Sequence, residues 1–325
     1  MPCYSPLKGF KDPVTGGLTF RRSDSQITME VACGQCLGCR LDRSLHWAMR
    51  MVHEAESHAA SGGNSFITLT YRDKEVSTKK QIREGYYIPD DWSLRKRHFQ
   101  LFMKRLRKEF PDQKIKYYHC GEYGSRCKHG LDLTLVKCPL CNVGRPHYHA
   151  ILFNCSFDDL EPYSEQNGRI RYTSEKLESI WRYGFVDVGR VTVQSAAYCA
   201  RYIMKKVNGA NAKEHYESVD LHGEVVDLQP EYSTMSNGIG AAWYAKYKDD
   251  VFPSDEVPVE GKGVMRGVPR FYDEKLRAED EDMYEEVKAK RLKYKEDHPE
   301  EFEGSRLESK FRVKKAQIST LARNL

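Results

Sequence analysis

Three strand-like segments limit the fold that this chain can adopt. Residues 66–71 (FITLTY), 115–122 (IKYYHCGE) and 146–153 (PHYHAILF) are rich in β-branched and aromatic residues, which favour strands. A basic stretch at 93–110 separates the first two, and a Cys-rich insertion at 123–145 separates the last two. No Gly-rich nucleotide loop supports a Rossmann or P-loop fold. The pattern predicts an α+β fold, with a central antiparallel sheet flanked by helices.

The spacing of apolar residues predicts further elements around this sheet. We expect helices at 41–60, 174–183 and 195–207, and a strand at 185–193. Ser93 is expected to cap the basic helix, which should end before Pro111. Composition divides the chain into a Cys-rich N-terminal segment with one helix (1–63), a core (64–210) and a C-terminal extension with a helical tail (211–325).

Charge and hydropathy indicate a protein that is neither exported nor embedded in a membrane. No apolar run approaches the roughly 20 residues of a membrane span, and Met1–Phe10 lacks the plan of a secretory signal. We therefore expect a soluble, cytoplasmic protein with no membrane partner. Ten cysteines in such a chain indicate free thiols or metal ligands rather than disulfides.

The basic stretch is the strongest local concentration of positive charge. The chain carries 52 Lys and Arg against 47 Asp and Glu, so its net charge is only +5. Residues 93–110 nevertheless hold four Arg and three Lys against one Glu, interleaved with apolar residues. Such a helix either follows a DNA backbone with its basic face or is simply solvated there. The candidate DNA-binding residues are Arg95, Lys96, Arg97, Lys104, Arg105, Arg107 and Lys108.

His147 and His149 form the first chemical motif. Because side chains alternate along a strand, the two imidazoles should project from one face and share a divalent metal. Glu122 ends the preceding strand and is the expected third ligand. His119 is its rival, but it lies three residues away and should face the opposite side. Two imidazoles and a carboxylate, completed by water and a phosphate oxygen, suit Mg²⁺ or Mn²⁺. An HxH pair alone also occurs as a structural feature.

Tyr198 and Tyr202 form the second motif. They lie four residues apart on the helix expected at 195–207 and therefore share a face, with Lys205 in the next turn. A tyrosine hydroxyl can attack a phosphodiester and become covalently linked to it, while a lysine neutralises developing charge. The alternative is a packed aromatic stripe.

These motifs together resemble the HUH endonucleases, and within them the replication initiators of small single-stranded DNA phages of the gokushovirus type. The resemblance rests on FITLTY (66–71), CGEY (120–123), RPHYHAILF (145–153) and AAYCARYIMKK (196–206). It extends to CGQCLGCRLDRSLHWAMR (33–50), GIGAAWYAKY (238–247), VPRFYD (268–273) and RLESKFRVKKAQISTLAR (306–323), and so covers most of the chain. It implies an RRM-like palm that carries the active site.

The resemblance also implies the chemistry. His147 and His149 become metal ligands, and Tyr198 and Tyr202 become the nucleophiles. Lys205 becomes the supporting lysine. Glu122 becomes the third metal ligand, a position whose residue type varies across the wider superfamily. Such an enzyme nicks origin DNA, remains on the 5′ end through tyrosine, leaves a 3′-hydroxyl for a host polymerase, and rejoins the strand to release single-stranded circles. The YxxK spacing favours Tyr202 for the first cleavage. A host helicase is an expected partner, because the chain has no ATP-binding motif.

Two other classes of protein remain open. One is a plasmid initiator, relaxase or transposase with the same catalytic core. The other is a non-catalytic, zinc-stabilised DNA-binding protein in which the histidines and tyrosines are structural.

The insertion at 125–144 departs from the family pattern, which usually has only a few residues here. It carries Cys127, His129, Cys138 and Cys141, a spacing compatible with a structural zinc knuckle. Cys33, Cys36 and Cys39 could recruit Cys3 to form a second zinc site.

Overall fold

The computed structural model divides the chain into two compact units. It describes residues 3–12, 15, 17–20, 28–124, 144–166, 169–201, 206–207, 209, 212–220, 223–259 and 263–320. Unit 1 comprises Met1–His46, Asp249–Val257 and Arg266–Leu325, and unit 2 comprises Trp47–Lys248 and Pro258–Met265. The domain boundaries that we expect at residues 63 and 210 remain a prediction.

Unit 2 is built on a seven-stranded sheet in which every neighbouring pair of strands is antiparallel. This confirms the predicted α+β fold with a central antiparallel sheet between helices. The strands, in their order across the sheet, are β12 (Tyr232–Met235), β5 (Lys116–Tyr123), β6 (Pro146–Phe153), β4 (Asn64–Thr70), β9 (Val186–Gly189), β8 (Arg169–Thr173) and β7 (Glu161–Gln166).

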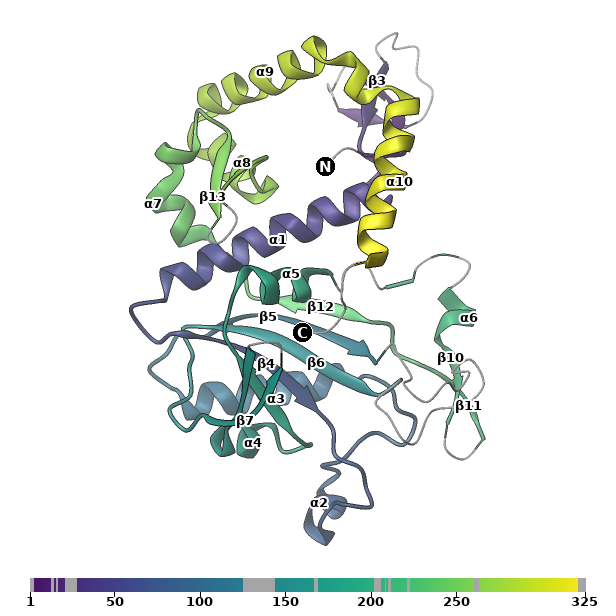
Figure 1. Ribbon diagram of the computed structural model, residues 1–325, viewed down its shortest axis with the longest axis vertical. Coiled ribbons are helices and arrows are strands. Elements are labelled where there is room, and N and C mark those ends of the chain that lie inside the picture. The colour runs from purple at the N-terminus through teal and green to yellow at the C-terminus, as the bar shows by residue number, and fades with distance from the viewer. Residues whose placement is uncertain are drawn as a thin grey trace. The chain divides into compact units, whose positions relative to one another are not determined.

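One face of this sheet packs on helices α3 (Lys96–Glu109) and α4 (Glu175–Trp181), which lie below the sheet in Figure 1. The strands present alternate residues to this face, and burial of their apolar side chains stabilises the pairing. The core residues include Ile67, Leu69, Phe99, Phe102, Met103, Leu106, Tyr148, Ala150, Leu152, Leu177, Ile180 and Trp181.

The opposite face of the sheet is covered by α5 (Val193–Arg201), above the sheet in Figure 1, and by the second half of α1 (Leu37–Ser57). The ring of Trp47 on α1 lies 5.3 Å from that of Tyr118 on β5. The buried carboxylate of Glu54 binds the Lys116 ammonium at 2.7 Å and accepts the backbone N–H of Gly240 at 2.7 Å. A buried carboxylate with two such partners offsets its loss of hydration and ties α1 to the sheet.

The basic helix begins later than expected, and the prediction that Ser93 caps it is wrong. Its N-cap residue is Arg95, which makes no side-chain capping bond. The Ser93 hydroxyl instead accepts the backbone N–H of Gln229, in the loop before β12, at 2.8 Å. The strand expected at 185–193 is also shorter, and ends at Gly189. Residues 202–205 of the helix expected at 195–207 lie outside the described residues.

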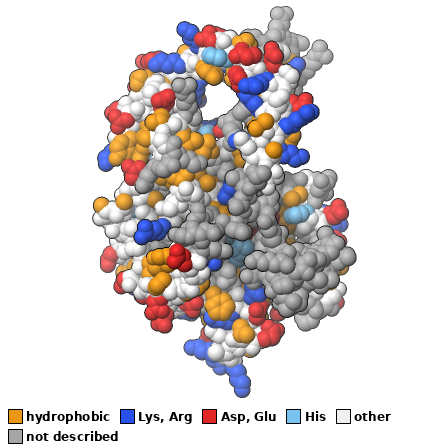
Figure 2. Space-filling view, in the orientation of Figure 1, with side chains coloured by type: hydrophobic (Ala, Val, Ile, Leu, Met, Phe, Trp, Pro, Cys, Tyr) orange, Lys and Arg blue, Asp and Glu red, His pale blue; other side chains and the backbone are white. Residues whose placement is uncertain are grey.

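Smaller elements complete unit 2. They are α2 (Lys79–Glu84), α6 (Ala212–Tyr216), β10 (Glu217–Val219), β11 (Val225–Asp227) and most of α7 (Ala241–Val251). Helix α2 has no buried residue, and Figure 2 shows Lys and Arg side chains at its tip, at the bottom of the view. Residues 251–270 contain the two-stranded sheet of β13 (Glu256–Val259) and β14 (Gly263–Arg266).

Unit 1 contains a small antiparallel sheet and the C-terminal helices. The sheet has the order β2 (Leu18–Thr19), β1 (Leu7–Lys11), β3 (Thr28–Val31). The helices are α8 (Arg270–Glu279), α9 (Glu281–Asp297), the 3₁₀ turn η2 (Pro299–Phe302) and α10 (Gly304–Thr320). The Arg291 guanidinium joins α9 to the carboxylates of Asp255 and Asp273. Over the described stretches of the chain, every helix is too short or too polar to cross a bilayer.

Candidate metal centre

Glu122, His147 and His149 meet on the sheet face covered by α5. The antiparallel register of β5 and β6 pairs Glu122 directly with His147, and strand alternation brings His149 to the same face. Glu122 Oε1 lies 2.7 Å from His147 Nε2 and 2.9 Å from His149 Nε2. One donor atom from each residue lies within 4.8 Å of the other two, close enough to hold one metal ion.

The contacts of His147 direct its Nε2 atom toward the carboxylate of Glu122. His147 Nδ1 lies 3.1 Å from the Arg145 carbonyl oxygen, so Nδ1 carries the ring hydrogen and donates it. The lone pair at Nε2 then faces the Glu122 carboxylate. Two acceptors at this separation attract each other only if a proton or a metal ion lies between them. A ligating histidine that donates its other nitrogen to a backbone carbonyl is the usual arrangement in metal sites.

Burial and the two neighbouring imidazoles act in opposite directions on the pKa of Glu122. The residue is 2% exposed, and its loss of hydration raises the pKa of its carboxyl group. The imidazoles of His147 and His149 act in the opposite direction and more strongly, so the net pKa of Glu122 lies well below its usual range. His149 is fixed from its other side, where Nδ1 lies 3.0 Å from Thr68 Oγ1 on β4. The cluster is therefore a pre-oriented set of one carboxylate oxygen and two ring nitrogens.

His119, the rival third ligand, lies on the other face of the sheet. Its ring stacks on that of Phe99 with 3.4 Å between centroids, and its Nδ1 lies 2.9 Å from Thr234 Oγ1. Burial lowers the pKa of His119 well below its usual value, so the ring is neutral. The three-residue offset from Glu122 explains this placement, because a strand turns odd and even residues to opposite faces.

Tyr198 is the residue of α5 that reaches the cluster. Its hydroxyl oxygen lies 3.4 Å from Glu122 Oε1 and 3.4 Å from His149 Nε2. Its ring meets the His149 ring edge-on at 5.0 Å and the Phe66 ring at 6.2 Å. These contacts aim a phenolic oxygen at the atoms that would surround a bound metal. Tyr202 and Lys205 lie outside the described residues.

Comparisons with known proteins find relatives over most of this chain. The family model for replication-associated protein ORF2/G2P matches residues 64–131 and 136–207. Replication-associated protein ORF2 of Spiroplasma virus 4 is 32% identical over 275 residues, which cover 82% of this chain and 74% of that protein. The chain belongs to this replication-associated protein family. The matched segments contain all three residues of the cluster and Tyr198, and no solved structure matches the chain.

Two further relatives extend the similarity over most of the chain. Replication-associated protein VP4 of Bdellovibrio phage phiMH2K is 30% identical over 312 residues, or 91% of this chain and 84% of that protein. Replication-associated protein ORF4 of Chlamydia phage 1 is 28% identical over 260 residues, or 78% of this chain and 55% of that protein. The resemblance to phage replication proteins that the motifs indicate is thereby confirmed.

Helix α3 packs on the sheet face opposite to Tyr198, so its basic residues lie on that side of the sheet. Arg105 donates to the carbonyl oxygens of Ile180 at 2.6 Å and Trp181 at 3.0 Å, and so caps the end of α4. Arg95 pairs with Asp91 at 2.7 Å. The exposed side chains of the set are Lys96, Arg97, Lys104, Arg107 and Lys108. Their contact with DNA remains a prediction, and it would occur away from the cluster.

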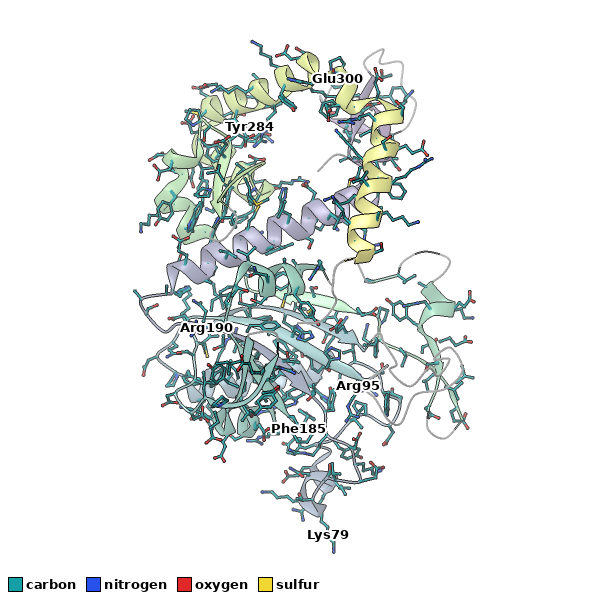
Figure 3. The ribbon with its side chains drawn as sticks, viewed as in Figure 1. Lys79, Arg95, Phe185, Arg190, Tyr284 and Glu300 are labelled. Carbon is teal, nitrogen blue, oxygen red and sulfur yellow. The ribbon has the colours of Figure 1, made fainter. Side chains whose placement is uncertain are left out.

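The face that carries the cluster has cationic and aromatic residues that the sequence analysis missed. Val186 and Val188 of β9 point into the core, so Phe185 and Asp187 project from the same face as Tyr198. Phe185, labelled in Figure 3, is 52% exposed, and the Arg72 guanidinium lies 5.5 Å from its ring centroid. Asp187 forms an ion pair with Arg171. The alternation in FVDVG (185–189) was the available signal.

The cysteine predictions have different outcomes. Cys127, His129, Cys138 and Cys141 lie outside the described residues, so the knuckle remains a prediction. In unit 1, however, Cys33, Cys36 and Cys39 come together with Cys3, and the four sulfur atoms lie within 4.8 Å of one another.

Proposed function

We propose that this chain is a metal-dependent DNA endonuclease and strand transferase that starts rolling-circle replication of a phage genome. Its family and the replication-associated names of its relatives support a part in DNA replication. The observation that carries the proposal is the Tyr198 hydroxyl, 3.4 Å from both Glu122 Oε1 and His149 Nε2. A nucleophile beside a buried donor cluster is the arrangement that tyrosine attack on a phosphodiester requires.

Glu122, His147 and His149 would hold the metal ion. The carboxylate supplies the charge, and the remaining coordination positions suit water and a phosphate oxygen, which favours Mg²⁺ or Mn²⁺. When bound, such an ion neutralises the charge of a scissile phosphate. Thr68 and the Arg145 carbonyl hold the two imidazoles in orientation, and both come from strands or strand ends of the rigid sheet.

The reaction of the protein itself is a transesterification. The Tyr198 oxygen forms a bond to phosphorus, and the bond from phosphorus to the 3′ oxygen of the neighbouring nucleotide breaks. The phenol loses one proton and the 3′ oxygen gains one, so the products are a 5′-phosphotyrosine and a free 3′-hydroxyl. The reverse step, with a 3′-hydroxyl as nucleophile, rejoins the strand and closes a circle.

Tyr202 and Lys205 complete the proposal through the family resemblance. With two tyrosines, one holds the first 5′ end while the second cleaves after one round of synthesis. The YxxK spacing favours Tyr202 for the first cleavage, and the position of Tyr198 supports its participation as the other nucleophile. Lys205 would neutralise charge that develops on the phosphate.

Single-stranded origin DNA is the proposed substrate. Exposed aromatic rings stack unpaired bases, and arginines beside them hold the backbone. Phe185 with Arg72 offers such a pair on the face of Tyr198. The basic side chains of α3 would then contact more distant DNA. A host DNA polymerase and helicase are the proposed partners, with action inside the bacterial host.

Covalent capture tests this proposal. Full-length protein is incubated with circular single-stranded DNA of the cognate genome and Mn²⁺, and the DNA-linked peptide is mapped by mass spectrometry. We expect adducts on Tyr198, on Tyr202 or on both. Tyr198→Phe should lose its own adduct and release closed circles poorly, and the double variant with Tyr202→Phe should form no adduct. Tyr294→Phe, which alters an exposed tyrosine of α9, is the matched control and should behave as wild type.

Three outcomes separate the alternatives. An adduct on a residue other than these tyrosines would overturn the assignment of the nucleophiles. Specific DNA binding with no adduct in Mg²⁺ or Mn²⁺ would indicate a non-catalytic DNA-binding protein. Exclusive first capture on Tyr198 would overturn only the order of cleavage.

A further inference from the structure

Unit 1 contains a second group of metal-ligating side chains, which the nuclease chemistry does not use. Cys3 precedes β1, Cys33 and Cys36 lie between β3 and α1, and Cys39 lies in the first turn of α1. We propose that these four cysteines bind one Zn²⁺ ion, and that this ion is the structural centre of the N-terminal module, residues 3–39. The proposal is independent of the proposed nuclease activity.

The distances between the sulfur atoms fit a tetrahedral zinc site. Cys3 Sγ lies 3.6 Å from Cys33 Sγ and 3.7 Å from Cys36 Sγ, and all four sulfurs lie within 4.8 Å of one another. With zinc–sulfur bonds of about 2.3 Å, neighbouring sulfurs of a regular tetrahedron stand about 3.8 Å apart. A disulfide would bring two sulfurs to about 2.0 Å. All four cysteines are free thiols.

The backbone around the sulfurs favours the thiolate form that binds a metal. Four backbone N–H groups donate to three of the sulfurs. Cys33 Sγ accepts from Gln35 at 3.4 Å and from Cys36 at 3.2 Å. Cys3 Sγ accepts from Cys33 at 3.3 Å, and Cys36 Sγ accepts from Tyr4 at 3.3 Å. Gly34, at a φ of 72°, makes the turn that directs the first two N–H groups to one sulfur.

The strands of the module form no apolar core among its described residues, which are 3–12, 15, 17–20 and 28–39. In strands β1, β2 and β3 the only buried residue is Gly9. Leu7 and Leu18 are each 45% exposed, and Met29 is 41% exposed. A sheet of three short strands without a buried face is marginal, and small modules of this kind usually depend on a metal or on disulfides. The four-cysteine group joins both ends of this sheet to α1.

Four thiolates with no oxygen or nitrogen donor select zinc over the ion expected at Glu122. Soft sulfur ligands in a tetrahedron suit zinc or iron, whereas magnesium and manganese prefer oxygen donors. A site in which all four positions are filled by protein leaves no place for a substrate, as in structural zinc sites. The two metal centres should therefore load and exchange separately.

Metal analysis of full-length variants tests the proposal. Cys33→Ser and Cys36→Ser should each lose one zinc per chain relative to wild type. Cys155→Ser, which alters a buried free thiol outside the group, should keep the wild-type zinc content. Cys138→Ser distinguishes zinc held by the insertion, because zinc at the four-cysteine group should survive that change. Unchanged zinc in Cys33→Ser and Cys36→Ser, or iron in place of zinc, would overturn the proposal.

A second measurement on the unaltered protein covers the case in which these variants do not fold. Alkylation followed by peptide mass spectrometry should find Cys3, Cys33, Cys36 and Cys39 protected in the zinc-loaded protein. A chelator should make all four reactive, and should open residues 3–39 to limited proteolysis before the rest of the chain. Equal alkylation with and without the chelator would refute the site, whatever the result of the covalent DNA capture.

Discussion

Tyr148→Phe is expected to lower the stability of unit 2 without changing its affinity for the metal. Tyr148 lies between the two histidines of β6, but strand alternation turns its side chain to the opposite face of the sheet, where it is fully buried. Its hydroxyl accepts the backbone N–H of Arg95 at 2.9 Å and donates to the Arg95 carbonyl at 3.1 Å. It also contacts the Tyr71 hydroxyl at 2.7 Å.

The size of the effect follows from the groups that keep another partner. The Arg95 carbonyl still accepts the backbone N–H of His98 at 3.0 Å, and the Tyr71 hydroxyl still contacts His98 Nδ1 at 2.8 Å. The Arg95 N–H alone loses the hydroxyl that accepts its hydrogen. Leaving one such group without this acceptor costs about 1–3 kcal/mol, so we expect a loss of about 2 kcal/mol.

Denaturant unfolding measures this loss, and Mn²⁺ titration of the folded variant measures the affinity. Tyr71→Phe is the matched control. It removes a hydroxyl from the same network but leaves the bonds to Arg95 intact, so its cost should be smaller. An unfolding free energy of Tyr148→Phe within about 0.5 kcal/mol of wild type would contradict the hydrogen-bond reasoning. A weakened Mn²⁺ affinity would show that the two faces of the sheet are not independent.

Three further predictions follow from the same unit. Glu122→Gln should weaken Mn²⁺ binding at least ~10-fold, since an amide lacks the ligand charge; isothermal titration measures this, and an unchanged affinity would remove Glu122 from the site. Burial lowers the pKa of His53 and of His98 to about 4, so the unfolded chain binds protons more readily than the folded one. Stability is therefore complete above the ordinary histidine pKa of about 6.5 and falls between about 6.5 and about 4, by up to roughly 3 kcal/mol for buried His53. Urea unfolding at pH 7 and pH 4.5 should show that fall, and His53→Gln should reduce it. Gly184→Ala would bring a Cβ atom to 2.2 Å from the Thr70 carbonyl oxygen and 2.5 Å from the Arg72 nitrogen, so it should destabilise the chain. Gly304→Ala, with open space around its Cβ position, should not meet such a clash. Thermal unfolding compares the two variants, and a Gly184→Ala protein as stable as wild type would contradict the close approach.

Local periodicity was sufficient to predict three strands of the sheet and which residues of each strand share a face, whereas the meeting of Glu122 with His147 depends on the register of β5 on β6. The strands at 66–71, 115–122 and 146–153 follow from runs of β-branched and aromatic residues, which need only short-range steric preferences. Strand alternation also separates Glu122 from His119, because the three-residue offset puts them on opposite faces. Both inferences use distances of a few residues along the chain, over which sequence determines geometry directly.

Only the tertiary structure decided what these elements pack against. The amphipathic pattern of 93–110 predicts a buried face, but it does not say which side of the sheet buries it, and α3 lies opposite Tyr198. The same limit applies to Ser93, whose hydroxyl bonds to Gln229, 136 residues away, rather than to its own helix. The sequence names Cys3 as a candidate fourth ligand, but only the structure brings it to Cys33 and Cys36, which lie 30 and 33 residues away. Contacts between distant segments depend on how whole elements bury their apolar faces together, and that balance is settled over the entire unit rather than in any local stretch of sequence.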